Sequence, residues 1–300
     1  MSKIRSFISF DDYSKDELQN ILNHASEIKQ NPYQPLLNNK QMVMIFEKNS
    51  TRTRLSFEIG MQQLGGNSVF LSSDKSQLGR GEIIEDTANV ISRYADIVMI
   101  RANKHEDVIK FADNAQIPVI NGLTDYNHPC QILADILTYN EHRGSIAGKK
   151  VTWVGDGNNV CTSWIEASHK FDFKLFIAVP EKYHANTQAL EIAAKSNANI
   201  ILTDDLCFAC KDADLITTDT WVSMGDEDYD DRMEALAPFQ VTESLLSMAK
   251  DDVLFMHCLP AHRGEEAEAA VIDGPKSVIF DEAENRIHVQ KAVICYLLNT

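Results

Sequence analysis

Short apolar runs alternate with longer amphipathic stretches along the whole of this 300-residue chain. The runs are rich in β-branched residues and predict strands at 42–46, 68–71, 97–100, 118–120, 151–155, 175–179, 199–202, 215–218, 253–257 and 278–280. Apolar residues at helical spacing predict helices over 12–30, 52–64, 82–94, 130–142, 161–171, 185–196 and 285–298. Because such alternation is typical of βαβ units, we expect an α/β fold with parallel sheets.

The distribution of the predicted strands indicates two lobes. Four strands precede residue 145 and about six follow it. The stretch "HRGSIAGKK" (142–150) contains two glycines and is the best candidate for the boundary. We therefore expect two lobes, each with a mainly parallel sheet flanked by helices.

Composition and charge narrow the class of protein. A formal net charge of −16 argues against nucleic acid and anionic membranes as partners, but a local cluster of cations can still bind a small anion. No stretch approaches the roughly 18 apolar residues of a membrane span, and the N-terminus lacks the apolar core of a signal peptide. We expect a cytosolic protein with no membrane partner.

The six cysteines are dispersed and do not indicate a disulfide framework. Cys207 and Cys210 form a CxxC pair, but the second pair or the spaced histidines of a zinc site are missing. We interpret the pair as buried apolar cysteines and predict no metal.

Polar or ionisable residues follow the ends of many predicted strands, where open parallel sheets bind their ligands. These residues are Ser50–Arg54, Arg101, Asn121 and His128, Asp156–Asn159, Asp219, and His257 with Cys258.

The stretch "FEKNSTRTRLSFE" (46–58) concentrates cationic and hydroxyl groups at the start of a predicted helix. Ser50 is a good N-cap, and free N–H groups with the helix dipole then favour an anion, most naturally phosphate. A plain helix cap with surface arginines is the alternative. Leu55, Phe57 and Ile59 begin apolar rows that we expect to hold the helix in place.

Two further motifs carry polar groups beside a proline turn. In "HPCQ" (128–131), a neutral imidazole and the Gln131 amide could orient a carbonyl compound, although a lone histidine is more often structural. In "HCLPAHRGEE" (257–266), Cys258 and His257 are adjacent on a strand and point to opposite faces. Contact of this segment with a substrate is therefore more plausible than nucleophilic attack by the thiol.

Two motifs in the second lobe leave alternatives open. "DTWVSMGDE" (219–227) suits an α-amino acid, with Asp219 for the ammonium and backbone amides for the carboxylate; the alternative is an acidic surface loop. "GDGNNV" (155–160) begins like a dinucleotide fingerprint, but Val160 stands where the third glycine belongs.

Together and in this order, the motifs resemble ornithine carbamoyltransferases, within the aspartate/ornithine carbamoyltransferase family. The resemblance covers essentially the whole chain and rests on "FEKNSTRTRLSFE", "SQLGRGE", "SRYADIVMIR", "HPCQILAD", "GDGNN", "DTWVSMG", "HCLPAHRGEE" and "ENRIHVQKA". It implies transfer of a carbamoyl group from carbamoyl phosphate to the side-chain amine of L-ornithine, giving L-citrulline and phosphate. No metal or organic cofactor is implied.

The resemblance also implies an architecture. A carbamoyl phosphate-binding domain would span 1–143, an ornithine-binding domain 144–284, and a C-terminal helix over 285–300 would pack back on the first domain. The chain would form a trimer or a multiple of trimers.

The family pattern implies roles for individual residues. The phosphate would be held by Ser50, Thr51, Arg52 and Thr53, with Gln77 reaching it from a neighbouring subunit. The rest of carbamoyl phosphate would contact Arg101, His128, Gln131, the carbonyls of Cys258 and Leu259, and Arg286. Ornithine would bind Asn159, Asp219, Ser223 and Met224. The catalytic set would be Arg101, His128, Cys258 and Asp219, whereas Arg54 would be structural and pair with neighbouring carboxylates.

Three alternatives stay open at this point. A related enzyme could use another amine acceptor, such as putrescine or N-acetylornithine. The chain could be a dinucleotide-binding module built on "GDGNN". A non-catalytic regulatory homologue is the third, although no site position is lost.

Overall fold

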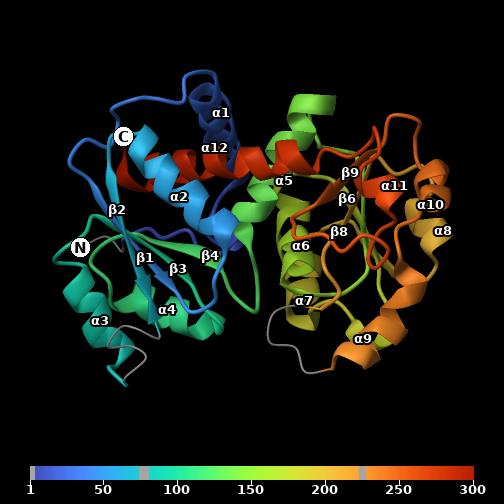
Figure 1. Cartoon of the computed structure of the whole chain (residues 1–300), viewed down its shortest axis with the longest axis horizontal. Helices are drawn as coiled ribbons and strands as arrows, with labels where there is room; N and C mark the ends of the chain where they lie inside the picture. The colour runs from blue at the N-terminus through green and yellow to red at the C-terminus, as the bar shows by residue number, and fades with distance from the viewer. Residues whose placement is uncertain (1–3, 74–80, 223–227) are drawn as a thin grey trace. The chain divides into compact units, whose positions relative to one another are not determined.

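The chain forms two compact units in a computed structural model that describes residues 4–73, 81–222 and 228–300. One unit comprises Met1–Ala134 with Glu284–Thr300, and the other comprises Asp135–Ala283. Each unit contains a parallel sheet with helices on its faces (Figure 1), so the predicted fold class is confirmed. The domain limits predicted at 1–143 and 144–284 stay predictions.

The first unit is built on a four-stranded sheet with the order β2-β1-β3-β4. Its elements include β1 (Gln41–Phe46), β2 (Asn67–Ser72), β3 (Ile97–Arg101) and β4 (Val119–Leu123), with η1 (Phe10–Asp12), α1 (Lys15–Gln30), α2 (Thr51–Gln63), α3 (Ile84–Ile91) and α4 (His105–Asn114). Two helices have residues in both units, namely α5 (Pro129–Arg143) and α12 (Ile279–Leu298). Figure 1 shows α3 and α4 on one side of this sheet and α1, α2 and α12 on the other.

Alternation along the strands builds the core of the first unit. Val43 and Ile45 of β1 belong to one buried cluster with Val108 and Phe111 of α4. Successive side chains of a strand point to opposite faces, so the intervening methionines of β1, which are also buried, face the other helical layer. Burial on both faces explains why β1 and β3 are almost continuously apolar.

The packing of α2 corrects one sequence prediction. Phe57, Met61 and Leu64 are fully buried, as the second apolar row predicts. Leu55 and Ile59, also expected to hold the helix in place, are 48% and 39% exposed. Both rows have helical spacing, but only the row of Phe57 is buried in the core.

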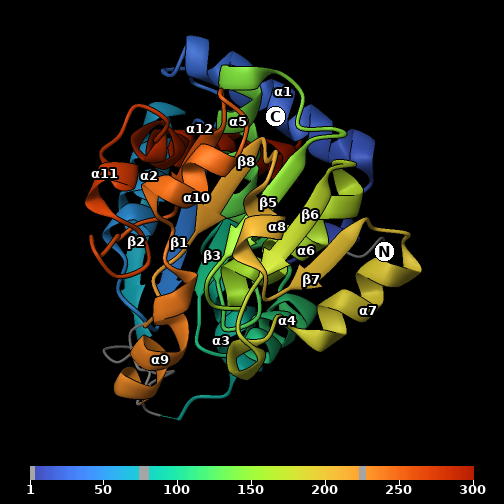
Figure 2. The ribbon, with the colours of Figure 1, turned by 90° about the vertical axis from the view of Figure 1, so that its right-hand side faces the viewer.

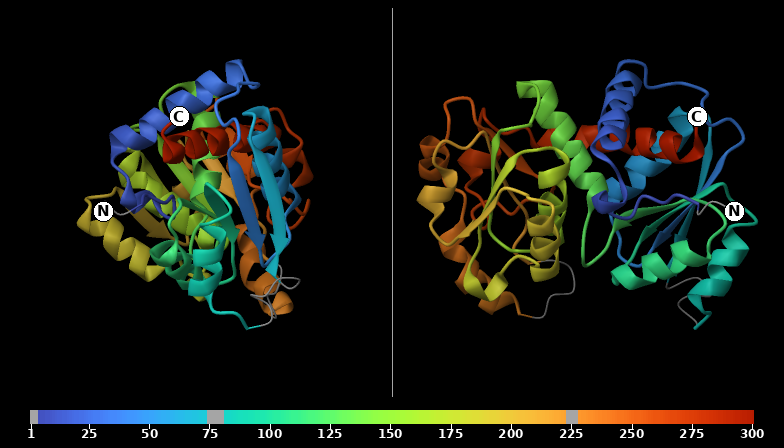
Figure 3. Two further views of the ribbon diagram at one scale, coloured as in Figure 1. Left: turned by 90° about the vertical axis from the view of Figure 1, so that its left-hand side faces the viewer. Right: turned by 180° about the vertical axis from the view of Figure 1, so that it is seen from behind.

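The C-terminal helix packs against α1 and α2 of the first unit (Figures 1 and 3). Lys29 of α1 donates to Asn285 Oδ1 at 2.9 Å. Lys291 is fully buried and donates to Gln63 Oε1 at 2.8 Å and to the carbonyl of Pro32 at 3.2 Å. A side chain at Gly60 would place its Cβ 3.2 Å from the Lys291 side chain, so the glycine permits close approach of α2 and α12.

Burial of Lys291 predicts a pH-dependent term in stability. Both described partners of its Nζ are neutral oxygens, and burial lowers the pKa of this lysine to about 8. The folded protein disfavours the charged form of Lys291. Below pH 8 the buried charge destabilises the fold fully, and this destabilisation disappears as the pH rises toward the ordinary lysine pKa of about 10.4. Raising the pH from 7 to 9.5 should therefore relieve at most ~2 kcal/mol of this destabilisation, which corresponds to a few degrees in Tm.

The measurement is the Tm of the wild type and of Lys291→Met over that pH range. Because other groups also titrate, the difference between the two proteins is the relevant quantity. The methionine variant should lose the extra alkaline stabilisation. Equal pH dependence in both proteins would contradict a depressed pKa for Lys291.

The second unit is built on a five-stranded sheet with the order β7-β6-β5-β8-β9. Its strands are β5 (Lys150–Val154), β6 (Lys174–Ala178), β7 (Ile200–Thr203), β8 (Leu215–Thr218) and β9 (Leu254–His257). Its helices include α6 (Asn159–Lys170), η4 (Glu181–Tyr183), α7 (Thr187–Lys195), α8 (Leu206–Cys210), α9 (Tyr229–Leu236), η5 (Ala237–Phe239), α10 (Glu243–Met248) and α11 (Ala269–Ile272). In Figure 2, α8 and α10 lie in front of this sheet.

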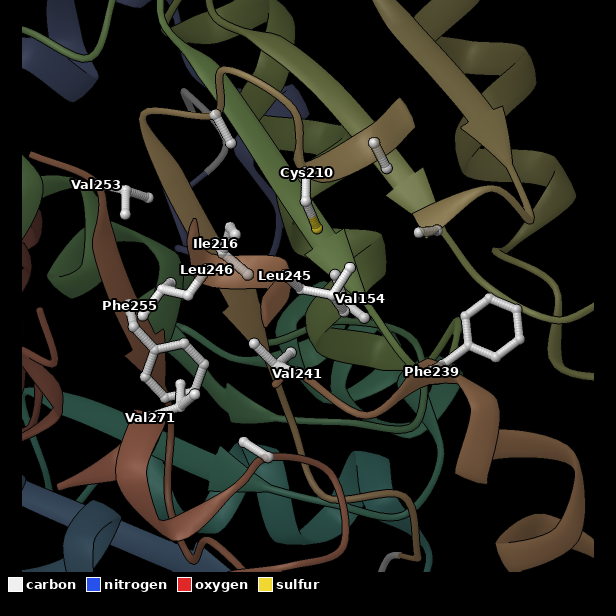
Figure 4. Packing of buried hydrophobic residues seen from close by; sticks show 14 of the residues in the cluster. Val154, Cys210, Ile216, Phe239, Val241, Leu245, Leu246, Val253, Phe255 and Val271 are labelled. Carbon is white, nitrogen blue, oxygen red and sulfur yellow. The ribbon is translucent and has the colours of Figure 1, made fainter. Parts of the chain in front are cut away.

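One face of the second sheet packs on short helices (Figure 4). Val154, Ile216 and Phe255 from three strands form a buried cluster with Leu245 of α10 and Val271 of α11. These short helices were not predicted from the sequence. Their polar flanks and few turns give too little periodicity for the 3.6-residue signal.

Two details of the sequence prediction are wrong. The strand expected at 278–280 is absent, because the pairing with β9 ends at an isolated bridge between Ser277 and Phe255 and the chain then enters α12 at Ile279. Cys207, expected to be buried with Cys210, is exposed, while Cys210 lies in the core.

Candidate active site

The turn after β1 and the first residues of α2 form the predicted anion site. Ser50 is the N-cap, as expected, and its hydroxyl accepts from Thr53 N at 3.3 Å. Thr51 is the first residue of the helix and is exposed, and Arg52 is half-buried. The turn therefore presents a helix N-terminus together with two hydroxyls and a guanidinium, which suits an anion.

Two further arginines reach the same turn from distant parts of the first unit. Arg101 ends β3 beside Phe46 of β1, and its guanidinium donates to Thr53 Oγ1 at 3.3 Å. Arg286 of α12 lies 3.5 Å from the same oxygen. Thr53 is only 1% exposed, so its hydroxyl joins the two cations inside the protein. This arrangement concentrates positive charge in a chain that is acidic overall.

His128 and Gln131 complete this cluster. Arg286 donates to Gln131 Oε1 at 2.5 Å, and Gln131 N donates to His128 O at 3.0 Å. Burial, followed by the charges of Arg286, Arg101 and Arg52, holds the pKa of His128 well below its ordinary value. The imidazole is therefore neutral at physiological pH and can donate or accept a hydrogen bond without carrying charge.

Arg54 pairs with a neighbouring carboxylate, as predicted from the sequence. Its Nε donates to Glu58 Oε2 at 3.1 Å, four residues along the same helix. Its guanidinium also lies 4.2 Å from the centre of the Phe70 ring. The side chain thus supports α2 and β2.

In the second unit, Asp219 lies at the end of β8 and is 7% exposed. Its Oδ2 accepts from Asn158 Nδ2 at 2.8 Å. Its Oδ1 accepts from Thr220 N at 2.8 Å and from Cys258 Sγ at 2.9 Å. These three donors fix the orientation of the carboxylate at the carboxyl end of the sheet.

Cys258 and His257 take separate partners, as strand geometry predicts. Burial, together with the charge of Asp219, raises the pKa of the Cys258 thiol well above its ordinary value, so it is a poor nucleophile. His257 Nδ1 accepts from Leu259 N at 2.9 Å, and its Nε2 lies 2.9 Å from Glu266 Oε1. These bonds hold the turn whose carbonyls the family pattern uses for substrate.

Two clusters of possible metal ligands occur in the described parts of the chain, namely Asp219 with His257 and Cys258, and His262 with Glu265 and Glu266. In the first, the thiol already donates to the carboxylate and both imidazole nitrogens have partners. The ligand atoms of the first cluster therefore all have hydrogen-bond partners within the protein, and the prediction of no metal stays a prediction.

The turn after β5 does not suit a dinucleotide. Asn158 is the N-cap of α6, and its side chain accepts from the N–H groups of Val160 and Cys161. A Cβ at Gly157 would lie 2.4 Å from the backbone of His184, so the next loop covers this glycine. In a dinucleotide fingerprint, the glycine at this position leaves room for the pyrophosphate to approach the backbone.

Several predicted site residues need separate mention. Asn159 is the first residue of α6, directly after the cap that bonds Asp219. Gln77, Ser223 and Met224 lie outside the described residues. Asn158, which the family pattern did not assign, contacts Asp219 directly, and its place before a predicted helix was the signal for it.

Comparisons with known proteins show the family of the whole chain. The family model "Aspartate/ornithine carbamoyltransferase, carbamoyl-P binding domain" matches residues 5–141, and the "Asp/Orn binding domain" of the same family matches 147–297. An ornithine carbamoyltransferase from Nitrosomonas europaea is 50% identical over 302 aligned residues, covering 99% of this chain and 97% of its own.

Solved structures agree as well. An ornithine carbamoyltransferase from Pyrococcus furiosus is 45% identical with a TM-score of 0.94 and covers 99% of this chain and 97% of its own. One from Burkholderia thailandensis is 49% identical with a TM-score of 0.91, at 98% and 99% coverage. The fold and site define a two-domain α/β protein with a cluster of arginines at a helix N-terminus in its first unit. The chain belongs to the aspartate/ornithine carbamoyltransferase family.

Proposed function

We propose that this protein transfers the carbamoyl group of carbamoyl phosphate to the side-chain amine of L-ornithine, giving L-citrulline and phosphate for arginine biosynthesis. The observation that carries the proposal is the cluster of Arg101 and Arg286 on Thr53, with a neutral His128, at the N-terminus of α2. Full-length relatives at about half identity support the same reaction.

Carbamoyl phosphate would occupy the first unit's anion cluster. Its phosphate would be bound by Ser50, Thr51, Arg52 and Thr53, and Gln77 would reach it from another subunit. Its carbamoyl group would contact Arg101, His128, Gln131 and the carbonyls of Cys258 and Leu259. Arg286 would complete the carbamoyl phosphate site.

The chemistry fits these groups. The neutral amine attacks the carbamoyl carbon, so negative charge grows on the carbonyl oxygen and then on the leaving phosphate. Arg52 and Arg101 stabilise that charge as it develops, and a neutral His128 can donate a hydrogen bond to the oxygen. Correct positioning of the two substrates supplies much of the remaining rate increase. This route needs no metal and no organic cofactor.

Ornithine would bind at the carboxyl end of the second sheet. Asp219 would hold the α-ammonium, with Asn159, Ser223 and Met224 as further contacts. Three hydrogen bonds keep the Asp219 carboxylate in one orientation, which supports its role as the fixed point of this site.

The lowered pKa of His128 predicts how the reaction should depend on pH. The imidazole stays neutral from pH 6 to 8, because its pKa lies well below 6.5. The rate should then follow the ornithine amine, whose reference pKa is about 10.4, and rise ~10-fold per pH unit in this range. The measurement is kcat/KM for ornithine against pH for the wild type and His128→Gln.

The two profiles should have the same shape, with the variant slower by about 10²-fold. A limb near pH 6.5 that is present in the wild type and missing from the variant would show that His128 titrates during catalysis.

The acceptor is tested with carbamoyl phosphate and a panel of amines. L-Ornithine should be carbamoylated. N-acetylornithine, which lacks the free α-ammonium that Asp219 would hold, and putrescine, which lacks the α-carboxylate, should each react at least about 10²-fold more slowly. Preference for either of the two would reassign the acceptor. Binding of NAD(P) at micromolar concentration would instead favour a dinucleotide-binding module.

We also propose a homotrimer, or a multiple of trimers, acting in the cytoplasm. The exposed apolar side chains Leu55 and Ile59 of α2 support burial of this face by another copy. No helix in the described ranges is long and apolar enough to cross a membrane.

A further inference from the structure

Arg232 is the one basic residue of α9, the helix "YDDRMEAL". Its side chain is 17% exposed, which is low for an arginine on a short helix. One terminal nitrogen donates to Asp156 Oδ2 at 2.8 Å and to the carbonyl of Trp221 at 3.1 Å. Its Nε donates to Asp228 Oδ1 at 2.9 Å.

The partners of Arg232 lie in the two turns that carry the proposed ornithine groups. Asp156 lies in the turn after β5, two residues before Asn158. Trp221 lies in the turn after β8, two residues beyond Asp219. The turns are also joined by the bond from Asn158 to Asp219. Arg232 thus provides a second connection between the two turns.

A third segment, which contains Tyr183, restricts the movement of the Arg232 guanidinium. Its central carbon lies 4.5 Å from the centre of the Tyr183 ring, and the Tyr183 hydroxyl donates to Asp228 Oδ2 at 3.0 Å. The carbonyl of Tyr183 accepts from Gly157 N at 3.0 Å, in the same turn as Asp156. A planar guanidinium stacked on a ring and bonded on two edges has little freedom to move.

We propose that Arg232 is a positioning residue for ornithine, an inference that rests on the proposed function. Arg232 sets the separation of the turns after β5 and β8, and this separation determines where Asn158, Asn159 and Asp219 lie. Direct binding of the substrate carboxylate by Arg232 is not part of this role, because its charge already faces Asp156 and Asp228. Loss of Arg232 should therefore weaken ornithine binding and leave the carbamoyl phosphate site intact.

The test compares Arg232→Met, Arg232→Lys and Asp156→Asn with the wild type in citrulline formation. Arg232→Met should raise KM for ornithine by about 10- to 100-fold, as expected for loss of charged hydrogen bonds, with KM for carbamoyl phosphate within about twofold. The ornithine KM of Arg232→Lys should lie between those of the wild type and Arg232→Met, because an ammonium cannot reproduce the bonds of the guanidinium to both Asp156 and Asp228. Binding of L-norvaline, which has the amino-acid groups of ornithine without the side-chain amine, should weaken in parallel.

The matched control is Lys182→Met. Lys182 lies 5.5 Å from the same Tyr183 ring and pairs with Asp231, but joins neither turn, so its loss should change both KM values less than twofold. An unchanged ornithine KM in Arg232→Met would overturn the proposal; should that variant not fold, an unchanged ornithine KM in both Arg232→Lys and Asp156→Asn would do so. Absence of citrulline with the wild type would overturn the proposed function instead.

Discussion

Replacing Arg52 by alanine is expected to lower kcat for citrulline formation by about 10³-fold. Arg52 lies at the first turn of α2, and its charge is one of three that depress the pKa of His128. The side chain would neutralise the phosphate as negative charge develops on it, so its loss should affect the transition state more than the ground state. Steady-state kinetics with both substrates measures the effect.

Arg54→Ala is the matched control, since it removes the same charge two residues further along the same helix. Arg54 pairs with Glu58 and lies over Phe70, so its loss should lower activity less than about tenfold, mainly through the stability of α2. Full activity in Arg52→Ala, or equal losses in the two variants, would refute the assignment of the anion site.

Asp219→Asn is expected to raise KM for ornithine by at least about 10²-fold, with a small change for carbamoyl phosphate. Asp219 accepts hydrogen bonds on both carboxylate oxygens, from Asn158 and Cys258 among others. An asparagine would place an NH₂ group against one of these donors and would remove the charge that attracts the α-ammonium. Ornithine binding and turnover are measured separately.

Asp214→Asn provides the control at the opposite end of the same strand. Asp214 is 8% exposed, precedes β8 and pairs with Lys250 at 2.7 Å, so its replacement tests the loss of a buried carboxylate as such. It should lower stability and leave KM for ornithine within about twofold. A comparable rise in both variants would mean that Asp219 acts through the fold and not through the substrate.

The sheets could be predicted from the sequence because their strands are short apolar runs separated by longer, more polar stretches. The run at 278–280 was wrongly predicted as a strand, since three apolar residues fit the first turn of a helix equally well. Phe280 is 70% exposed there, which a buried strand would not allow. In α2, helical spacing alone could not decide which of two apolar rows would be buried.

The grouping of side chains at the proposed anion site was predictable in part for a physical reason. Ser50 and Arg101 follow strands whose carboxyl ends lie side by side in the sheet, so strand order alone brings them together. The pairs Asn158–Asp219 and Asp156–Arg232 are separated by 61 and 76 residues. No local pattern encodes such pairs, and only the folded second unit identifies them.

The most direct test of the central claim is the stoichiometry of the reaction. Purified protein is incubated with carbamoyl phosphate and L-ornithine, and citrulline and phosphate are measured in the same samples. The account predicts one citrulline for each phosphate released above the spontaneous breakdown of carbamoyl phosphate, with no such release when ornithine is omitted. Enzyme-dependent release of phosphate without citrulline would contradict it.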